Sequence, residues 1–305
     1  MKKILRKICP NWIHHIYAET KFWIQFHLFP RMIVDDLFQG IMGYRINWKD
    51  PQDLNEKINW MKFYSDTSEW TRLADKYLAR DYIKEKIGDY VLPKLYGVWT
   101  KAEEIDFNQL PDKFVMKTNH GCGDVVIVED KSLVNTEKIR TEMSNAIKHK
   151  FGYRTLEPHY MKISPVIMAE QLIENDSDFS TSIADYKVWC INGKPECILI
   201  CSDRMGKKCT LSWYDVDWNF LHDVNTGRHG NDFKEIPRPV CLKQMLEYST
   251  ILSEGFPQIR VDFYIEKGKL YVGELTFTSQ GGYMDYLSRD FSLKLGKNVP
   301  LIRKK

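Results

Sequence analysis

Apolar and polar residues alternate in two runs near the C-terminal end of the chain, and these runs predict a β-hairpin. The runs cover residues 259–266 and 269–276, with Lys267-Gly268 between them. Each run carries an acidic residue, Asp262 in the first and Glu274 in the second, at a place where strands favour β-branched or aromatic residues. The local cost of these acids suggests that they have a function.

The register of this hairpin decides whether the two acids can act together. A two-residue loop would pair Asp262 with Gly273, whereas a three-residue loop from Lys267 to Lys269, with a glycine bulge, would pair Asp262 with Glu274. We expect the second register. It places on one face Arg260, Asp262, Glu274 and Thr276, and on the other Val261, Phe263, Ile265, Tyr271 and Leu275.

Two facing carboxylates repel each other unless a cation lies between them. Oxygen ligands of this kind suit Mg²⁺ beside a nucleotide phosphate. A half-exposed hairpin whose acids pair with Lys or Arg is the alternative.

The rest of the chain predicts a mixture of helices and strands. Asp53 is placed to cap the first helix of the main part, in which apolar residues recur at helical spacing. Further helices are expected over residues 68–86, 135–151 and 240–254. Strands are expected over residues 91–98, 113–117, 125–128 and 165–173, and in an Asn-Gly hairpin over 185–191 and 195–201.

Residues 1–43 predict a separate helical piece. Its basic start resembles that of a signal peptide, but the apolar run that should follow is missing. Residues 22–34 are apolar yet too short and too mixed to span a bilayer. They would form an amphipathic face, which packs against its own domain or lies on a membrane or a partner.

Two stretches suggest contacts to a nucleotide. An apolar strand ends on Lys117, and a loop with Gly121 and Gly123 follows, whose backbone could approach phosphates closely. It is not a P-loop, and a plain hairpin turn is the alternative. A second strand closes on Glu170 before Leu172 and Ile173, which suits an adenine pocket, although an edge-exposed glutamate is also common.

Other polar residues follow in the second half of the chain. Asp185 and Lys187 share one face of a predicted strand. Asp203-Arg204 comes directly after the partner strand. Asp215 and Asp217 form an Asp-x-Asp triplet, which some sugar-nucleotide transferases use to hold a metal, although such triplets arise often by chance.

Composition narrows the class of protein. A chain of 305 residues suffices for two or three lobes, and a net charge of +3 without a basic block gives no indication of nucleic-acid binding. Seven cysteines without a Cys-x-x-Cys pair indicate reduced thiols in the cytoplasm rather than disulfides or a zinc site.

The order of these motifs resembles the ATP-grasp superfamily: Lys117 before a glycine loop, Glu170 closing a strand, then Asp262 and Glu274 on a hairpin. The resemblance is closer to the teichuronopeptide-biosynthesis branch, called TupA-like ATP-grasp, and covers about Tyr44 to the end. The stretches that carry it are Asn55–Trp60, Leu73–Tyr77 with Arg80, Lys117–Gly123, Asp185–Lys187, Asp203-Arg204 and Gly273–Thr276.

This resemblance implies an α+β fold, with two α+β lobes clasping ATP and an N-terminal helical extension. The implied divisions are an extension over 1–45, a region before the ATP-grasp lobes over 46–110, a small lobe with the glycine loop over 111–175, and a C-terminal lobe with the Mg²⁺ site over 176–305. The Gly281-Gly282 turn resembles the superfamily's loop at the acceptor end.

The resemblance also implies roles for individual residues. Lys76 and Lys117 would reach the phosphates of ATP under a flexible loop from Thr118 to Asp124. The residues implied for ATP are Lys76, Lys117, Thr118, His120, Gly121, Gly123, Glu170, Gln171 and Ile173, with Asp185 or alternatively Asp178 for the ribose. Lys187, Arg204 and Arg260 are implied as catalytic cations, and Asp262, Glu274 and Thr276 as metal ligands. Thr276 departs from the superfamily, where an asparagine is usual; a hydroxyl can also ligate a metal, and the resemblance implies one or two Mg²⁺ ions.

The function implied is an ATP- and Mg²⁺-dependent carboxylate–amine ligase of capsule or surface-polysaccharide synthesis, at work in the cytoplasm or at the inner face of the membrane. It would activate a uronic acid or an amino acid as an acyl phosphate and form an amide, on a free, lipid-linked or nucleotide-linked saccharide. One rival is a glycosyltransferase that uses Asp215 and Asp217. The other is a non-catalytic nucleotide-binding protein docked through residues 1–43.

Overall fold

The computed structural model describes residues 24, 26–204, 209–228 and 234–304, and the chain divides into two compact units, Met1–Ile46 and Asn47–Lys305. The first unit contains helix α3 (Pro30–Met42), which buries Val34 and Phe38 on one face and ends at Gly43 in the left-handed conformation. Most of the predicted piece over residues 1–43 lies outside the described residues. None of the described helices is long and apolar enough to cross a membrane.

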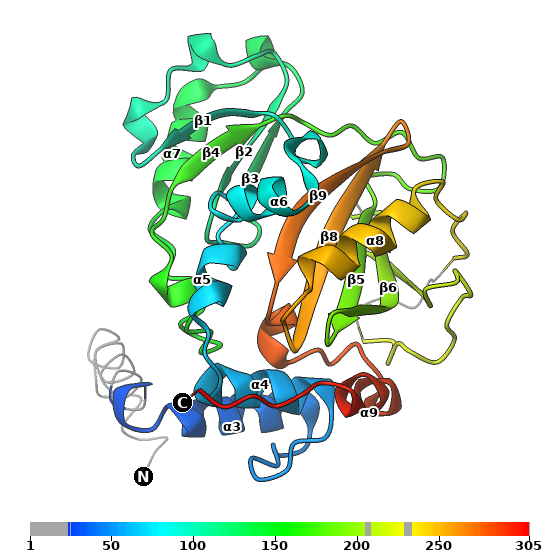
Figure 1. Ribbon diagram of the computed structural model, residues 1–305. Helices are drawn as coiled ribbons and strands as arrows, with labels where there is room; N and C mark the ends of the chain where they lie inside the picture. The colour runs from blue at the N-terminus through cyan, green and yellow to red at the C-terminus, as the bar shows by residue number, and fades with distance from the viewer. Residues whose placement is uncertain (1–23, 25, 205–208, 229–233, 305) are drawn as a thin grey trace, which may run out of the picture. The chain divides into compact units, whose positions relative to one another are not determined.

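The second unit contains two antiparallel sheets with helices between and around them (Figure 1). The four-stranded sheet has the order β1-β4-β2-β3, with β1 (Leu95–Trp99), β2 (Phe114–Thr118), β3 (Val125–Val128) and β4 (Ile167–Glu170). The five-stranded sheet has the order β7-β6-β5-β8-β9, with β5 (Asp185–Ile191), β6 (Lys194–Ser202), β7 (Thr210–Tyr214), β8 (Gln258–Glu266) and β9 (Lys269–Thr276).

The helices of this unit are α4 (Leu54–Tyr64), α5 (Ser68–Ala74), α6 (Ala79–Ile87), α7 (Thr136–Ala146), α8 (Leu242–Leu252) and α9 (Arg289–Lys297). Short 3₁₀ helices are η1 (Asp89–Val91), η2 (Ala102–Glu104), η3 (Phe107–Gln109), η4 (Lys131–Leu133), η5 (Tyr160–Lys162) and η6 (Ser279–Gly282). The predicted cap of α4 is confirmed: Asp53 accepts a hydrogen bond from the Glu56 amide, and Glu56 accepts one from the Asp53 amide.

The two faces of the four-stranded sheet have different surroundings. Side chains on one face join a core with α7, η2 and η3: Phe114, Met116, Val128, Ile167 and Ala169. The register places on the opposite face Val115, Lys117, Val125, Ile127, Met168 and Glu170. The strand alternation therefore presents Lys117 and Glu170 away from the core of this lobe.

The five-stranded sheet is covered on one face by α8. Cys190 and Val261 belong to that face, and the Cys190 thiol lies 3.6 Å from the Ser249 carbonyl of α8. At one end of the opposite face Phe291 of α9 packs against Trp213 at a ring separation of 5.5 Å. The rest of that face carries the polar residues of the candidate site.

The structure corrects one predicted helix. Residues 68–86 form two helices, α5 and α6, rather than one, because the chain turns at Asp75. The Asp75 carboxylate accepts hydrogen bonds from the amides of Tyr77 and Leu78, which replaces the bonds that a continuous helix would make. The break matters because Lys76 lies in it.

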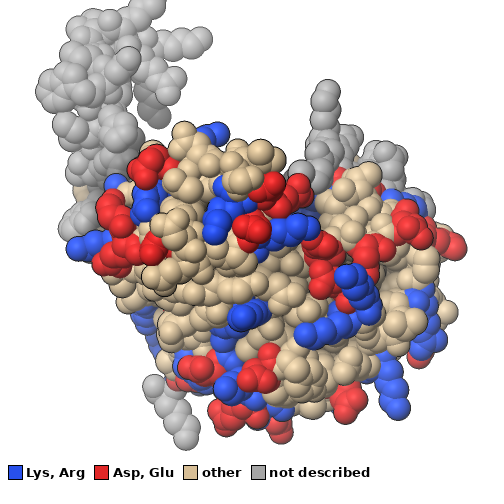
Figure 2. Space-filling view, turned by 90° about the horizontal axis from the view of Figure 1, so that it is seen from above, with Lys and Arg blue, Asp and Glu red and all other residues tan. Residues whose placement is uncertain are grey.

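Charges on the surface are mixed. Seen from above, Lys and Arg side chains are interspersed with Asp and Glu side chains, and neither sign gathers into one large patch on this face (Figure 2). This face therefore gives no sign of a binding site for a strongly charged partner.

Candidate functional site

The β8–β9 hairpin pairs the two acids, as predicted, but by a different route. Its loop has two residues, Lys267 and Gly268, both with positive φ (51° and 75°), and Glu266 pairs with Lys269. The expected three-residue loop is therefore wrong. Pairing shifts between Asp262 and Phe263, so that Phe263 faces Val272 while Asp262 faces Glu274. The extra residue is Gly273, within β9.

A contact with Tyr264 explains why a glycine stands at this bulge. A Cβ on Gly273 would lie 2.6 Å from Cε2 of the Tyr264 ring, closer than real atoms approach. The bulge also reverses the facing of residues beyond it. Tyr271 pairs with Tyr264 and so lies on the same face as Asp262, and the prediction that placed it on the apolar face is wrong.

Asp262 is buried and bound by two cations. Arg260 holds it in a bidentate pair, with Nε–Oδ1 at 2.6 Å and Nη2–Oδ2 at 2.7 Å, and Lys187 Nζ lies 2.6 Å from Oδ2. Burial alone would raise the pKa of Asp262, but Arg260 and Lys187 outweigh it and hold this pKa below its usual value. Asp262 thus has the Lys and Arg partners that the alternative interpretation expected, but it is buried rather than half-exposed.

Glu274 is held by a lysine that comes from the break between α5 and α6. Lys76 Nζ lies 3.0 Å from Glu274 Oε1 and donates to the Gly121 carbonyl at 2.8 Å. Burial raises the pKa of Glu274, and so does the nearby charge of Asp262. Lys76 and Arg260 lower this pKa by more, so that it lies below its usual value. One ammonium group therefore joins the glycine loop to the hairpin.

Asn119 fixes the position of this lysine. Its side-chain amide donates to Asp75 at 2.8 Å and to the Ser164 carbonyl at 3.0 Å, and its side-chain oxygen accepts from the Val166 amide at 2.7 Å. The Lys76 amide in turn donates to the Asn119 carbonyl at 3.1 Å. Asn119 is 1 % exposed, so the polar atoms of its side chain are satisfied by the protein alone.

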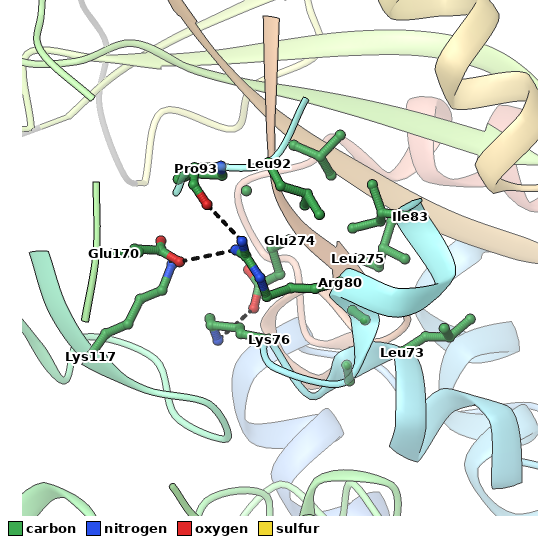
Figure 3. Close-up of a pocket in the computed structure, with 14 residues that line it drawn as sticks. Leu73, Lys76, Arg80, Ile83, Leu92, Pro93, Lys117, Glu170, Glu274 and Leu275 are labelled. Carbon is green, nitrogen blue, oxygen red and sulfur yellow. Dashed lines mark hydrogen bonds and ion pairs between the residues drawn. The ribbon is translucent and has the colours of Figure 1, made fainter. Parts of the chain in front are cut away.

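Lys117, Glu170 and Arg80 form a second group of charges beside the first (Figure 3). Lys117 Nζ contacts Glu170 Oε1, and Arg80 Nη1 lies 3.6 Å from Glu170 Oε2 while Nη2 donates to the Pro93 carbonyl at 2.7 Å. The pocket lined by these side chains also reaches Lys76 and Glu274, and its cavity volume of about 20 Å³ is near that of one water molecule. Five charged side chains, from the two sheets, α6 and the α5–α6 turn, thus meet in one narrow pocket.

The glycine loop carries polar atoms without a protein partner. Among the described residues, buried side-chain atoms that lack a hydrogen bond include Thr118 Oγ1 and His120 Nδ1. His120 Nε2 lies 2.9 Å from the His149 carbonyl, which ties the loop to the end of α7. Gly123 has a φ of 88°, and a Cβ on Gly121 would lie 2.5 Å from the Asp124 carboxylate. Unsatisfied buried atoms of this kind favour a ligand at the loop.

Asp185 stands at the far side of the Asp262 pair. Its Oδ2 accepts from Lys187 at 2.6 Å and from Arg204 at 2.9 Å, whereas its buried Oδ1 has no partner. Asp185 also raises the pKa of the Tyr264 phenol, and burial adds to that rise. Tyr264 is therefore a site residue that the sequence interpretation missed, and its place two residues after Asp262 on the same strand is the signal that could have found it.

The remaining residues implied for the nucleotide lie further out. Ile173 is buried, but the Gln171 side chain accepts from the Lys94 amide at 3.3 Å and so helps to hold the strand edge. Asp178 is exposed on a turn. Arg80 is named in the sequence only as part of the family motif that includes Leu73–Tyr77. In the structure it lines the same pocket as Lys76.

The Asp-x-Asp triplet lies in a turn. Asp215 Oδ1 accepts from the amides of Asp217 and Asn219, and Oδ2 accepts from the Asn219 side chain at 2.8 Å. Asp217 is exposed. The carboxylate of Asp215 closes the turn after β7, which removes the support for the transferase alternative.

The oxygen donors at the hairpin fit a Mg²⁺ ion that arrives with phosphates. Thr276 is 5 % exposed and its hydroxyl accepts from Arg260 at 3.1 Å, beside Asp262 and Glu274. Nowhere in the described part of the chain do three His, Cys, Asp or Glu side chains converge as a metal-binding group. Two carboxylates and a hydroxyl leave coordination positions for phosphate and water, which is the usual way in which proteins bind Mg²⁺.

Comparison with solved structures finds proteins of related architecture. The D-alanine–D-alanine ligase of Bacillus anthracis complexed with ATP is 18% identical, with a TM-score of 0.41 over 75% of this chain and 62% of that chain. The enzyme of the same name from Helicobacter pylori is 14% identical, with a TM-score of 0.41 over 81% and 69%. The L-amino acid ligase of Bacillus licheniformis is 15% identical, with a TM-score of 0.40 over 70% and 43%.

The chain thus spans less than two thirds of the Bacillus anthracis ligase and less than half of the Bacillus licheniformis one. No curated protein matches it. The model of one protein family, described as TupA-like ATP-grasp, matches residues 56–300, which include both sheets and every charged residue of the pocket. The chain therefore belongs to the TupA-like ATP-grasp family and has the α+β fold of the ATP-grasp proteins.

Proposed function

We propose that the protein is an ATP- and Mg²⁺-dependent carboxylate–amine ligase. The observation that carries this proposal is the bulged hairpin, which sets Asp262 opposite Glu274, with Lys187 of the same sheet beside Asp262 and Lys76 of the α5–α6 turn beside Glu274. Family membership supports it, because two lobes that bring lysines and metal-binding acids together are what ATP-dependent ligation requires.

The nucleotide would bind where the two sheets face each other. Lys76 and Lys117 would hold its phosphates, with the orphaned Thr118 and His120 atoms of the glycine loop beside them. Glu170, Gln171 and Ile173 lie at the end of β4 for the adenine, and Asp185 offers an unpartnered oxygen to a ribose hydroxyl, with Asp178 as the alternative.

Binding requires two ion pairs to open. Lys76 and Lys117 are already paired with Glu274 and Glu170, and the pocket between them has room for about one water molecule. When the phosphates attract both lysines, Glu274 is released for the metal. Until the nucleotide arrives, the carboxylates of Glu274 and Glu170 therefore neutralise the two lysines that would hold its phosphates.

Each of the remaining residues has a role in the transfer. Asp262, Glu274 and Thr276 would hold Mg²⁺, and the bound ion would supply positive charge beside the transferring phosphoryl group. Arg260, Lys187 and Arg204 would neutralise the charge that develops on the substrate oxygens. A substrate carboxylate oxygen attacks the γ-phosphorus and ADP leaves. An amine then attacks the acyl carbon, phosphate leaves with the carbon–oxygen electron pair, and the amine loses a proton.

The substrates belong to the same proposal. A uronic acid or an amino acid is the carboxylate, and the product is an amide in a bacterial surface or capsular polysaccharide, on a lipid-linked or nucleotide-linked saccharide. The family resemblance supports this context. The odd number and the spacing of the cysteines in the sequence support work in the cytoplasm.

Thermal shift and ADP release test the proposal together. We expect ATP with Mg²⁺ to raise the melting temperature, since a ligand at about 100 times its dissociation constant adds roughly 2.7 kcal/mol. Sugar nucleotides with Mn²⁺ should leave it unchanged. A panel of uronic and amino acids should then release ADP when an amine is present. A shift with a sugar nucleotide alone would overturn the proposal, and ATP binding without turnover on any pair would favour a non-catalytic nucleotide-binding protein.

A further inference from the structure

Helix α4 buries a row of polar side chains. Asn55, Asn59 and Lys62 recur at helical spacing, and their exposed fractions are 0 %, 0 % and 6 %. Polar residues at such spacing on a helix usually face water, and burying an amine is costly unless it is fully hydrogen-bonded. The row therefore needs a structural or functional reason.

That row binds the loop that follows the metal-ligand strand β9. Lys62 Nζ donates to the Gly281 carbonyl, to the Thr155 carbonyl at 3.0 Å and to the Asn59 side chain at 2.9 Å. Asn59 donates to the Gly282 carbonyl at 2.7 Å. The contacts hold consecutive carbonyl groups of η6 against the helix.

The loop can be held so closely because it is built of glycine. A Cβ on Gly282 would lie 2.7 Å from the Asn59 amide, and one on Gly281 would lie 3.0 Å from Thr155. Gln280 precedes them with a φ of 44°, which few residues other than glycine adopt readily. The backbone of η6 is thus set in a demanding conformation by contacts with α4 and the segment around Thr155.

From this loop one contact leads back into the site. The Ser279 hydroxyl accepts from Arg260 Nη1 at 3.1 Å, and the same guanidinium holds Asp262 in its bidentate pair. An unbroken series of contacts therefore runs from the Lys62 ammonium through Gly281 and Ser279 to the arginine of the metal site.

The Lys62 side chain is buried, yet its ammonium group stays charged at neutral pH. Burial lowers the pKa of Lys62 to about 8, and Glu157 opposes this shift. The Tyr283 ring lies 4.7 Å from the ammonium. Glu157, whose charge opposes the shift, accepts hydrogen bonds from Thr155 and from Thr278. These two bonds fix the Glu157 carboxylate beside the start of the η6 loop.

We propose that Lys62 is a positioning residue for the acceptor half of the site: its buried ammonium fixes the Ser279–Gly282 loop and, through Ser279, the guanidinium of Arg260. The proposal rests on the proposed ligase function, and it separates the two halves of the reaction. Nucleotide groups on β2, β4 and the α5–α6 turn do not depend on Lys62, whereas the loop after β9 does.

The test compares Lys62→Met with Lys57→Met. Lys57 is on the same helix and also donates to a backbone carbonyl, that of Val299 at 2.9 Å, but does not contact the η6 loop. Ser279→Ala is a second test variant, which removes the contact with Arg260 and leaves the buried row of α4 in place.

Two readouts are measured on these proteins. The first is amide hydrogen exchange of peptides over residues 277–287, which needs no substrate. The second is ADP release with the uronic acid and amino acid pair that the wild type uses best. We expect Lys62→Met to speed the exchange of these amides about tenfold or more and Lys57→Met to leave it unchanged. Lys62→Met and Ser279→Ala should raise the KM for the acid or the amine about 10- to 100-fold while the KM for ATP changes less than about twofold.

Unchanged exchange of the loop in Lys62→Met overturns the proposal. Equal loss of affinity for ATP and for the acceptor overturns it too, because that is the result of a merely structural role. If the wild type releases no ADP with any pair, the ligase function fails instead, and the exchange measurement alone decides whether Lys62 fixes the loop.

Discussion

Substituting Glu274 by alanine separates chemistry from stability at the hairpin. The Glu274 side chain is 24% exposed, lies 3.0 Å from Lys76 and faces Asp262 across the bulge. Removing it takes away a proposed metal ligand and frees Lys76, which keeps its hydrogen bond to Gly121. It also relieves the repulsion from Asp262, whose own partners Arg260 and Lys187 remain.

The structure sets the size of both effects. An exposed ion pair contributes up to about 1 kcal/mol and breaking a buried one costs roughly 3–5 kcal/mol, so this half-buried pair should cost about 2 kcal/mol at most. For a unit of this size that lowers the melting temperature by roughly 4–8 °C, with the transition still cooperative. Loss of a metal ligand at the transferring phosphoryl group should cost about 4 kcal/mol of transition-state stabilisation, or close to 10³-fold in rate.

Differential scanning calorimetry and ADP release measure the two quantities on the same protein. Glu254→Ala is the matched control, since its carboxylate is 75% exposed and makes a surface pair with Lys86 at 3.4 Å. We expect that control to change neither quantity by much. If Glu274→Ala no longer melts cooperatively, the acid is structural. If it keeps its turnover, Glu274 is not a metal ligand, and the mechanism fails.

Three further predictions follow from particular contacts. Gly273→Ala should lower the free energy of unfolding by about 1–3 kcal/mol in urea melts, because its Cβ meets Tyr264, and the loss should shrink in a Tyr264→Ala background; equal losses in both backgrounds would argue against the clash. Asn119→Ala should cost roughly 1–3 kcal/mol and raise the KM for ATP, because the turn that carries Lys76 loses its anchor; an unchanged KM would remove Asn119 from the nucleotide site. Burial lowers the pKa of Lys62 to about 8 in the folded protein, against 10.5 unfolded, so at this residue the folded state binds fewer protons between these values, and the stability of the wild type relative to Lys62→Met should rise from pH 8 to 10.5. In urea melts at several pH values, the free energy of unfolding of the wild type should gain about 3 kcal/mol over that of Lys62→Met across this range. Parallel curves for the two proteins would show that the amine is not buried in solution.

Local patterns predicted the elements that bear the site. The alternation over residues 259–276 gave a hairpin with Asp262 opposite Glu274, and the structure confirms that pairing. The predicted three-residue loop was wrong, because the sequence around Lys267-Gly268 fits a two-residue turn as well as a three-residue loop. Only the contact of Gly273 with the Tyr264 ring tells where the extra residue lies.

Contacts between distant segments were harder to foresee. A helical pattern runs through residues 68–86, and an aspartate at position 75 can bind the amides that follow it but does not by itself predict a break. The break depends on Asn119, 44 residues away in the chain, which binds the Asp75 side chain. Propensity and periodicity describe neighbours in sequence, so a turn stabilised from another lobe lies beyond their reach.

The acceptor half of the site shows the same limit in a stronger form. The apolar positions of α4 indicate its inward face correctly, but its polar positions suggest a solvent-facing stripe, because patterning assumes that polar residues lie outside. The structure buries Asn59 and Lys62 as well, since the glycine carbonyls of η6 accept their hydrogen bonds. The acceptors in this loop are the backbone carbonyl groups of Gly281 and Gly282, which the sequence does not reveal. A contact between backbone carbonyls and a buried amine is therefore found only when both segments are seen together, and for that reason the sequence proposes nucleotide contacts in more detail than it proposes contacts of the η6 loop.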